Sequence, residues 1–351
     1  MTRVDESRTS PRATEREYLE TINETLRPAI GGPLVLDLFA GCGGLALGFE
    51  AHGFETIGFE MNRDAARTYE SNLHGQCNNV KLSAESIFPK AQVVIGGPPC
   101  QPFSVGGHQR GIDDSRNGFP IFFSAIRQAQ PEIWLFENVR GLLYRNRWYL
   151  DQVIEELEGL GYETHTNLYN ALDFGVPQNR ERLVVFGCKK AFRPPRGSLR
   201  RVTAGEALQA LAIDAPDNGK YLTSSMDAYV KKYELASKCV NPRDLHLDRP
   251  ARTLTCRNLA GATGDMHRVK LPDGRRRRLT VREAARLQSF PDWFEFSGAE
   301  GSQFEQVGNA VAPLFAHALA TSVLDHLNGR TVADDEVHPQ IGRQLAIDMV
   351  T

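Results

Sequence analysis

Residues 33–60 read PLVLDLFAGCGGLALGFEAHGFETIGFE, and this stretch decides the fold. It opens with an apolar run broken by a single acid, and the glycine-rich turn Ala40–Gly44 follows. A helical stretch, Leu45–His52, then leads to a second apolar run, Thr56–Phe59, which ends at Glu60. A strand, a tight turn, a helix and a second strand in this order predict a βαβ unit with parallel strands.

The alternation of strands and helices continues beyond this unit. Asn62 can cap the next helix, and the apolar runs Val93–Ile95 and Ile133–Phe136 predict two further strands, the second of which stops at Glu137. The pattern predicts an α/β fold with a doubly wound, mostly parallel sheet. Ligands of such sheets bind beyond the carboxyl ends of the strands. The residues that map to this edge are Gly41, Glu60, Cys100 and Glu137.

The composition changes after Gly187, where the alternation ends and proline and basic residues become frequent. This change predicts a second, smaller domain. A capping pattern at Thr280 and Glu283 opens a short helix, and a final apolar helix from about Ala312 to Leu327 returns to the first domain. We predict an N-terminal arm and helix (1–30), a first domain (31–188), the second domain (189–279), the return to the first domain (280–330) and a tail (331–351).

Charge is unevenly distributed along the chain. The whole protein carries a formal charge of −2, but residues 189–282 hold 21 Lys and Arg against nine Asp and Glu, a net charge of +12. The remainder therefore carries −14. One basic segment in an acidic chain is the asymmetry expected where a single lobe meets phosphate. We expect the run Arg275–Arg278 within this segment to be a solvated turn.

Cysteine usage and the N-terminus bear on the cellular setting. The six cysteines among 351 residues include no C-x-x-C pair and are too few for a disulfide scaffold. We therefore expect a reducing interior and no metal site. Residues 1–16 are polar and lack a signal core, and no later run suggests a membrane span. These features predict a soluble, cytoplasmic protein.

A stiff loop follows the strand predicted at Val93–Ile95. It reads GGPPCQPFS over residues 96–104 and contains Cys100. The two glycines allow backbone to approach a ligand closely, and each of the three prolines fixes φ and removes an amide donor. Such a loop holds a side chain at a set angle. Cys100 is therefore a candidate nucleophile, although an isolated cysteine is more often a small apolar residue.

The glycine-rich turn is compatible with two cofactor classes. Gly41, Gly43 and Ala46, with Glu60 downstream, fit a dinucleotide-binding fingerprint in which the acid binds a ribose. The same geometry serves S-adenosylmethionine, whose ribose also needs a carboxylate. The cysteine loop favours this second class, because methylation of an unreactive aromatic ring carbon requires a covalent nucleophile.

Five segments together carry a family resemblance. They are DLFAGCGG (37–44), GPPCQPFS (97–104), ENV (137–139), QNRER (178–182) and QVGN (306–309). In this order they resemble the DNA (cytosine-5) methyltransferase family of the bacterial restriction-modification type. The resemblance implies the S-adenosylmethionine-dependent methyltransferase fold, with the second domain as a DNA-recognition domain.

The resemblance also implies a mechanism. Carbon 5 of cytosine is not nucleophilic, so the thiolate of Cys100 would add to carbon 6 of a cytosine flipped out of the duplex, and the activated ring would then take up the methyl group. Glu137 would act at ring nitrogen 3, and Arg182 would contact the target base. Arg180 and Arg182 alternate along a strand-like segment, so we expect both on one face, with Arg180 ordering the nucleophile loop.

Further residues follow from the same resemblance. Ser83 or Glu85 could hold the adenine amino group, because the Asp-Ile pair usual in the family is missing here. The expected contacts to S-adenosyl-L-methionine are Phe39, Ala40, Gly41, Cys42, Gly43, Gly44, Leu45, Glu60, Met61, Pro98, Asn309 and Val311.

The DNA contacts are expected from the nucleophile loop and the second domain. A glycine-containing loop from Ser104 to Asn117 is expected to close over DNA. Asn258 and His267 are candidate base readers beside the main set. The main expected DNA-binding residues are Gln101, Ser104, Arg252, Thr253 and Arg257.

Three functions are compatible with the sequence. The first is an active monomeric enzyme that methylates double-stranded DNA and protects it from a cognate restriction endonuclease acting separately. The second is a cytosine-5 methyltransferase acting on transfer RNA, and the third is a catalytically silent DNA-binding module. The basic second domain favours duplex DNA. The presence of Cys100, Glu137 and the arginine pair argues against the silent module.

Overall fold

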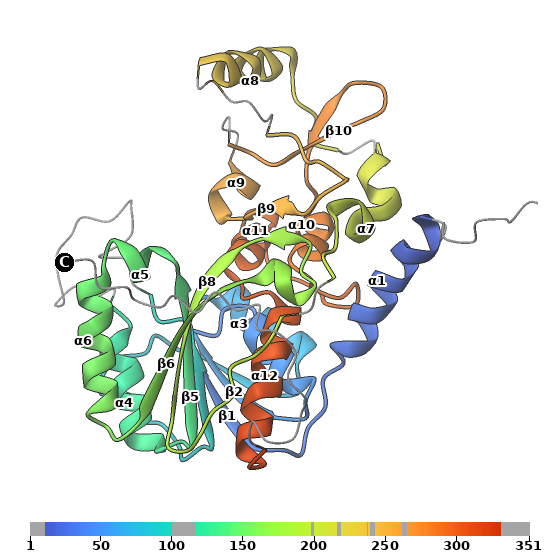
Figure 1. Cartoon of the computed structure of the whole chain (residues 1–351). Helices are drawn as coiled ribbons and strands as arrows, with labels where there is room; N and C mark the ends of the chain where they lie inside the picture. Colours follow the sequence, from blue (N-terminus) through green and yellow to red (C-terminus); the bar gives the residue numbers. More distant parts are fainter. Residues whose placement is uncertain are drawn as a thin grey trace, which may run out of the picture.

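The computed structural model describes residues 11–99, 117–197, 200–215, 219–236, 238, 243–261 and 265–330. A seven-stranded sheet lies in the lower body, and a smaller lobe stands above it (Figure 1). The sheet strands are β1 Leu34–Leu38, β2 Glu55–Glu60, β3 Gln76–Asn79, β4 Val93–Gly96, β5 Ile133–Val139, β6 Glu163–Asn170 and β8 Glu181–Cys188.

The strand order in this sheet is β3-β2-β1-β4-β5-β8-β6. Strands β1 to β5 pair in parallel, whereas β8 pairs antiparallel with both β5 and β6. Val35, Leu36 and Leu38 of β1 are fully buried, as expected for a central parallel strand that is covered on both faces. The predicted mostly parallel α/β sheet is confirmed.

Strand β5 is longer than the sequence predicts. The expected end at Glu137 is wrong, because the strand continues to Val139. Glu137 and Val139 remain in the ladder opposite Val184 and Arg182 of β8. The polar residues Glu137 and Asn138 suggest that the buried strand has ended. Pairing with the antiparallel strand β8 nevertheless continues the hydrogen-bonded ladder to Val139. Glu137 is thus fixed by a strand rather than by a loop.

Helices cover both faces of the sheet (Figure 1). Helices α2 and α12 pack on the face of Val35, and α4 and α6 pack on the face of Leu36. The predicted final helix is confirmed as α12, so the C-terminal part completes the body that the N-terminal part begins. The bounds are α2 Gly44–Glu50, α4 Phe119–Ala129, α6 Arg147–Glu158 and α12 Pro313–Leu327.

The C-terminal helical stretch has an unexpected composition. By length and hydropathy, residues 300–327 could cross a membrane, which the sequence analysis did not anticipate. However, 61% of the most apolar window is buried inside the protein. The stretch is also divided into α11 (Glu300–Asn309) and α12. Its apolar side chains therefore belong to the core.

Two predicted helix starts are confirmed. The side chain of Asn62 accepts hydrogen bonds from two backbone N–H groups at the start of α3 (Arg63–Asn72). Thr280 and Glu283 form a reciprocal capping box at the start of α10 (Val281–Leu287). Short-range hydrogen bonding alone determines where these helices begin.

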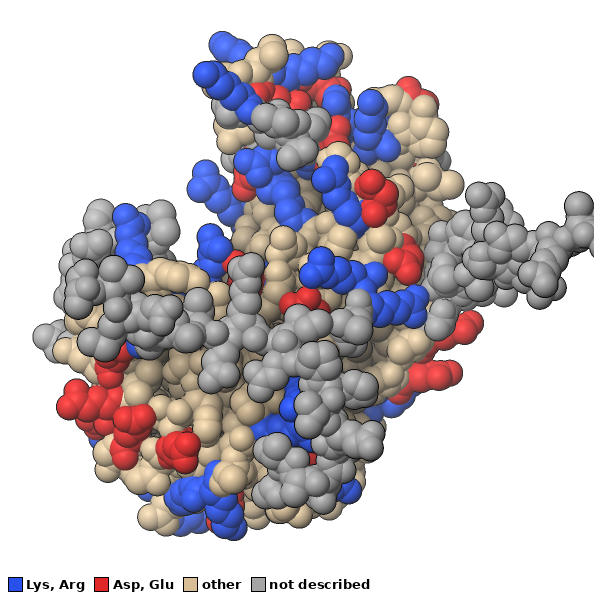
Figure 2. All heavy atoms as spheres, viewed as in Figure 1, with Lys and Arg blue, Asp and Glu red and all other residues tan. Residues whose placement is uncertain are grey.

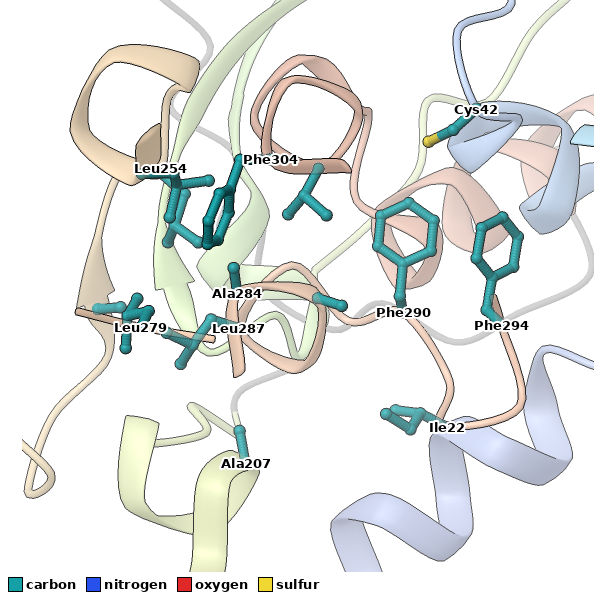
Figure 3. Close-up of a cluster of buried hydrophobic side chains, with 14 of the residues drawn as sticks. Ile22, Cys42, Ala207, Leu254, Leu279, Ala284, Leu287, Phe290, Phe294 and Phe304 are labelled. Carbon is teal, nitrogen blue, oxygen red and sulfur yellow. The ribbon is translucent and has the colours of Figure 1, made fainter. Parts of the chain in front are cut away.

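The upper lobe packs on the body through one buried apolar cluster. Figure 3 shows Ile22, Leu254, Phe290 and Phe304, which come from segments far apart in the sequence. The cluster joins the lobe to the helix at residues 11–25 and to residues 284–307, and the domain boundaries at 188 and 279 remain a prediction.

The remaining elements are α1 Pro11–Thr25, α5 Gly141–Tyr144, η2 Ala171–Phe174, β7 Gln178–Asn179, α7 Ala204–Leu208, η3 Gln209–Ile213, α8 Ser224–Ala236, β9 Ala251–Arg252, α9 Cys256–Ala260, β10 Arg268–Lys270 and β11 Arg276–Arg278.

Several arginines of the lobe are structural. Arg277 is 1% exposed and places its guanidinium 2.8 Å from both carboxylate oxygens of Glu283. Arg276 and the fully buried Arg268 share the carboxylate of Asp244. The expectation of a solvated turn over the arginine run is therefore wrong for its buried members. Several of the 21 basic side chains are therefore held by carboxylates within the lobe and are not presented to solvent.

Helix α2 approaches α12 closely at Gly48, where an added Cβ would lie 2.4 Å from backbone atoms of Ala316 and His317. Gly48→Ala should lower the free energy of unfolding by about 1–3 kcal/mol, because the helices must separate. Denaturant titration would measure this change. Gly301→Ala in α11, where a Cβ meets nothing within 4 Å, should be neutral or stabilising. Equal loss of stability in both variants would contradict the prediction.

Candidate functional site

The turn after β1 has an unusual backbone. Phe39, Gly41 and Gly43 all have positive φ angles, of 58°, 56° and 88°. Phe39 is the only one of the three with a Cβ, and such strain in a side-chain-bearing residue is concentrated at functional sites. Gly44 lies so close to Val311 that an added Cβ would be 2.5 Å from its carbonyl oxygen. The turn thus brings two predicted cofactor segments together.

Glu60 holds this turn against the next helix. One carboxylate oxygen accepts the N–H of Gly41 at 2.9 Å, and the other accepts the N–H of Asn62 at 2.7 Å. Met61, the next residue, has an exposed apolar side chain at the same edge. A carboxylate fixed by two backbone N–H groups beside an apolar side chain suits a ribose and an adenine ring.

A buried acid lies beneath the turn. Asp37 is 1% exposed, and its Oδ2 atom has no hydrogen-bond partner among the described residues. Burial, followed by the nearby carboxylates of Glu60 and Glu50, raises the pKa of Asp37. A buried carboxyl oxygen without a hydrogen-bond partner is unusual, and here it lies under the glycine turn.

The other predicted cofactor residues lie around the same turn. The side chains of Ala40, Cys42, Leu45 and Val311 are buried. Burial raises the pKa of Cys42 to about 12, so its thiol stays protonated. Asn309 accepts a hydrogen bond from the thiol of Cys256 at 2.9 Å. Ser83 and Glu85, the adenine candidates, are exposed between β3 and β4.

The nucleophile loop begins at the carboxyl end of β4. The Pro98 carbonyl accepts a hydrogen bond from the Asn138 side chain at 3.0 Å. A Cβ on Gly97 would lie 3.9 Å from a carboxylate oxygen of Glu137. The loop therefore starts beside the predicted acid. Cys100, Gln101 and Ser104 lie outside the described residues, as does most of the loop expected to close over DNA.

Glu137 and Arg182 form an ion pair across neighbouring strands. The Arg182 Nε atom lies 2.7 Å from Glu137 Oε1, and each side chain is 12% exposed. The pair is therefore accessible from the site but shielded from bulk water. The carboxyl group of Glu137 and the planar guanidinium of Arg182 lie in contact. Side by side, they can hydrogen-bond to a ring nitrogen and to a ring carbonyl.

Arg180 is placed differently from its neighbour Arg182. It is 2% exposed and donates hydrogen bonds to the carbonyls of Leu254, Gly308 and Ala310 at 2.7, 3.0 and 3.1 Å. These hydrogen bonds of its guanidinium go to backbone carbonyls, so burial sets Arg180 apart from the partly exposed Arg182, with which it is expected to share one face. The side chain of Arg180 joins the lobe, the end of α11 and the start of β8.

The predicted DNA-reading residues are not equally accessible. Thr253 donates its hydroxyl hydrogen to the carbonyl of Asn179 at 2.7 Å. Arg252 is partly buried and pairs with Asp265 at 3.0 Å. Arg257, at the start of α9, is exposed. Among these three, Arg257 has the side chain best placed to reach DNA.

Two further candidate base readers are buried. Asn258 is 3% exposed and completes the capping box of α9 with Thr255. Burial, reinforced by Arg252, lowers the pKa of His267 to about 3, so its ring is neutral. Both residues stabilise the lobe in this structure. Their polarity in the sequence resembled that of base-reading residues, but burial depends on packing that local sequence does not reveal.

The sequence analysis missed two positioning residues. Asn138 holds Pro98, as described above, and its place in the ENV motif could have indicated this role. Gln178 accepts the backbone N–H of Leu254 at 2.8 Å and donates to the carbonyl of Leu287. Strand β7 also pairs with β9, so the QNRER segment fixes the position of Ala251 and Arg252, which precede Thr253.

Basic side chains gather on the upper lobe. Figure 2 shows Lys and Arg over much of this lobe, while acidic side chains are prominent on the lower body. Arg257 and the exposed lysines of α8, Lys231 and Lys232, belong to the basic lobe. The distribution agrees with the charge asymmetry of the sequence and suits a polyanion beside the lobe.

Comparison with known proteins identifies the family. The family model described as C-5 cytosine-specific DNA methylase matches residues 34–325. The type II methyltransferase M.AplI of Arthrospira platensis is 58% identical over 317 residues, which cover 90% of this chain and 92% of that relative. The type II methyltransferase M.NgoFVII of Neisseria gonorrhoeae is 32% identical over 83% of this chain and 86% of its own length.

Solved structures support the fold. A DNA modification methyltransferase encoded within an E. coli prophage has a TM-score of 0.62 and 24% identity, covering 85% of this chain and all of that one. Spodoptera frugiperda DNMT2 has a TM-score of 0.65 and 16% identity, covering 84% and 100%. Together, the family match, the relatives and the site show that the chain belongs to the C-5 cytosine-specific DNA methylases, and that it is a DNA cytosine-5 methyltransferase of the bacterial restriction-modification type that uses S-adenosyl-L-methionine.

Proposed function

We propose that the protein methylates carbon 5 of a cytosine flipped out of a specific duplex DNA sequence, through a covalent adduct with Cys100. The contact that supports this most strongly is the 2.7 Å ion pair between Glu137 and Arg182 at the start of the nucleophile loop. Pro99, the last described residue of that loop, directly precedes Cys100. The described start of the nucleophile loop and the ring-binding pair thus belong to one edge of the sheet.

Each group of the pair has a separate chemical task. The thiolate of Cys100 adds to carbon 6, which moves electron density toward ring nitrogen 3. Glu137, as a carboxylic acid, donates a proton toward that nitrogen and so stabilises the electron-rich ring, and Arg182 donates to the ring carbonyl. Carbon 5 then takes up the methyl group. Removal of the carbon-5 proton by a base, return of the proton from nitrogen 3 and elimination of the thiolate restore the aromatic ring and free the cysteine.

The cofactor supplies an electrophilic methyl group on its sulfonium. Glu60 would bind the ribose hydroxyls, and Met61 would pack on the adenine. The backbone of the turn, Pro98, and the segment at Asn309 and Val311 would enclose the rest. The positive φ angles of the turn, which bring backbone close to a ligand, and its fixed carboxylate fit the ribose part of the cofactor. The turn residues are Phe39, Ala40, Gly41, Cys42, Gly43, Gly44 and Leu45.

A cytosine stacked in a duplex cannot reach a pair that is only 12% exposed. We therefore infer base flipping, which costs about a few kcal/mol for unstacking and unpairing. Arg257 is the candidate base reader with an exposed side chain, while Arg252 and Thr253 shape the surface around it. Gln101 and Ser104 of the nucleophile loop complete the proposed DNA contacts.

We also propose a setting for this activity. The enzyme works as a monomer in the cytoplasm, and its methylation protects DNA from a cognate restriction endonuclease that acts separately. The names of the related type II methyltransferases support this role. Arg180 is a positioning residue in this proposal, because it contacts backbone carbonyls and not the reacting base.

Bisulfite sequencing of DNA from cells that express the protein tests the function. Cytosines within one recurrent sequence should remain unconverted, because methylation at carbon 5 blocks deamination. Cells expressing Cys100→Ser should lose this protection. In vitro, tritiated methyl groups should be transferred to duplex DNA and not to transfer RNA. Label in transfer RNA alone would contradict the proposal.

A mechanism-based trap tests the covalent step. A cognate duplex carrying 5-fluorocytosine should cross-link to Cys100 when S-adenosylmethionine is present, because fluorine cannot leave as the carbon-5 proton does. Peptide mass spectrometry would locate the adduct. Glu137→Gln should slow adduct formation, since an amide cannot transfer a proton to ring nitrogen 3 as the thiolate adds to carbon 6. A cross-link at another cysteine would refute the assignment.

Glu60→Gln tests the cofactor site. Loss of the carboxylate charge should raise the Kd for S-adenosylmethionine about tenfold, because charged hydrogen bonds exceed neutral ones by about 1–2 kcal/mol. Isothermal titration calorimetry would measure this. Glu55→Gln, an exposed carboxylate at the other end of the same strand, is the matched control and should leave the Kd unchanged. Equal Kd values for both variants would overturn the ribose assignment.

A further inference from the structure

A second basic and aromatic surface lies on the body rather than on the lobe. It follows β5 and includes α5 and the start of α6. Tyr144 and Trp148 are 58% and 51% exposed, which is unusual for large aromatic side chains. We name this set the rim surface, and its exposed residues are Val139, Arg140, Tyr144, Arg145, Arg147 and Trp148.

The segment that carries the rim surface is well anchored. Leu142, Leu143 and Leu150 are buried in the core beneath it. Tyr149 is also buried and donates its hydroxyl hydrogen to Asn117 Oδ1 at 2.7 Å. The segment therefore supplies its own core residues. Trp148 also contacts the ring of Tyr149, with 5.8 Å between the ring centroids, while about half of its own surface stays exposed.

The charge of the rim surface stands out from its surroundings. Residues 138–150 contain three arginines and no Asp or Glu, although the chain outside residues 189–282 carries −14. Arg140 pairs with Glu181 and Arg147 pairs with Asp151, both in solvent-exposed positions where ion pairs exchange at little cost. In the described part of the chain, Arg145 has no acidic partner within ion-pair distance.

The rim surface begins where the proposed reaction centre ends. Val139 lies opposite Arg182 in the β5–β8 ladder, two residues after Glu137. The neighbouring Glu181 holds Arg140. Figure 1 shows α5 at the upper edge of the body, across from the lobe that carries α9. If a flipped cytosine enters between the body and the lobe, the phosphates that flank it in the DNA strand pass over the edge of the body that carries α5.

We propose that the rim surface binds the sugar-phosphate backbone of the target strand beside the flipped cytosine. Arg145 contacts a phosphate, and Tyr144 and Trp148 pack on the exposed sugar and on a base next to the gap. Arginine and aromatic side chains together suit a nucleic acid that is locally unstacked. This inference rests on the proposed function and adds to it a second wall of the DNA-binding site.

A second copy of the chain is the alternative occupant. A two-fold dimer would bring the same surface of each copy face to face. Arg145, which has no acidic partner among the described residues, would then face the like charge of its counterpart. A polyanion such as DNA would instead attract the arginines of the rim surface, so the positive charge of this surface favours DNA over a second copy of the chain.

The experiment compares Arg145→Glu with Lys90→Glu. Lys90 is exposed just before β4, at the opposite edge of the sheet, and its substitution changes the charge equally. Fluorescence anisotropy with the cognate duplex would measure affinity over a range of salt concentrations. Arg145→Glu should weaken binding about tenfold and reduce the slope of log K against log salt by about one. Lys90→Glu should behave as the unmodified protein.

Two further variants separate fold from contact. Arg145→Gln should keep the thermal stability of the unmodified protein and lose affinity in the same direction. Trp148→Ala should weaken binding about tenfold with an unchanged salt slope, because stacking carries no charge. With each variant, the KM for DNA should rise more than kcat falls.

The outcomes distinguish this inference from the proposed function. If the protein methylates DNA but Arg145→Glu and Lys90→Glu bind it equally, the rim surface is not a DNA contact. If Arg145→Glu abolishes self-association in sedimentation and leaves DNA affinity unchanged, the surface is a dimer contact and the inference is overturned. If no methyl transfer to DNA occurs but Arg145→Glu still weakens duplex binding, the proposed function fails and the rim surface stands.

Discussion

A single buried guanidinium holds the main parts of the site in register. Arg180 donates to carbonyls of Leu254, Gly308 and Ala310, which belong to the lobe and to the segment that closes the cofactor turn. Each carbonyl would be costly to leave unsatisfied in the interior. The chain continues from Arg180 into β8, where Arg182 contacts Glu137. One side chain therefore connects the segments proposed for DNA recognition, cofactor binding and the reaction.

The internal use of arginine changes how the charge of the lobe should be interpreted. Arg268, Arg276 and Arg277 are paired with acids inside the lobe, so the number of basic residues overstates the basic surface available to phosphate. The exposed arginines near the reaction centre matter more, whichever domain carries them. On this view the DNA site has two walls, and the acidic body contributes one of them.

Local rules predicted much of the fold and the site from the sequence. The βαβ unit, the cap at Asn62 and the capping box at Thr280 depend on neighbouring residues, and the structure contains all three. The predictions that failed depend on distant partners. The predicted end of β5 is too early, because pairing with β8 extends the strand to Val139. His267 is a candidate base reader by sequence, but tertiary packing buries its side chain, and local sequence does not reveal such burial. The contact between Glu137 and Arg182 could not be predicted from local sequence, because it depends on the pairing of β5 with β8.

The path of the chain has a consequence for synthesis. Helix α12 and the segment before it come late in translation, yet they pack on the first strand and on the glycine turn. A chain on the ribosome that has not yet reached Val311 lacks the contact that this residue makes with the glycine turn. The domain that the chain begins first is therefore the one that it completes last.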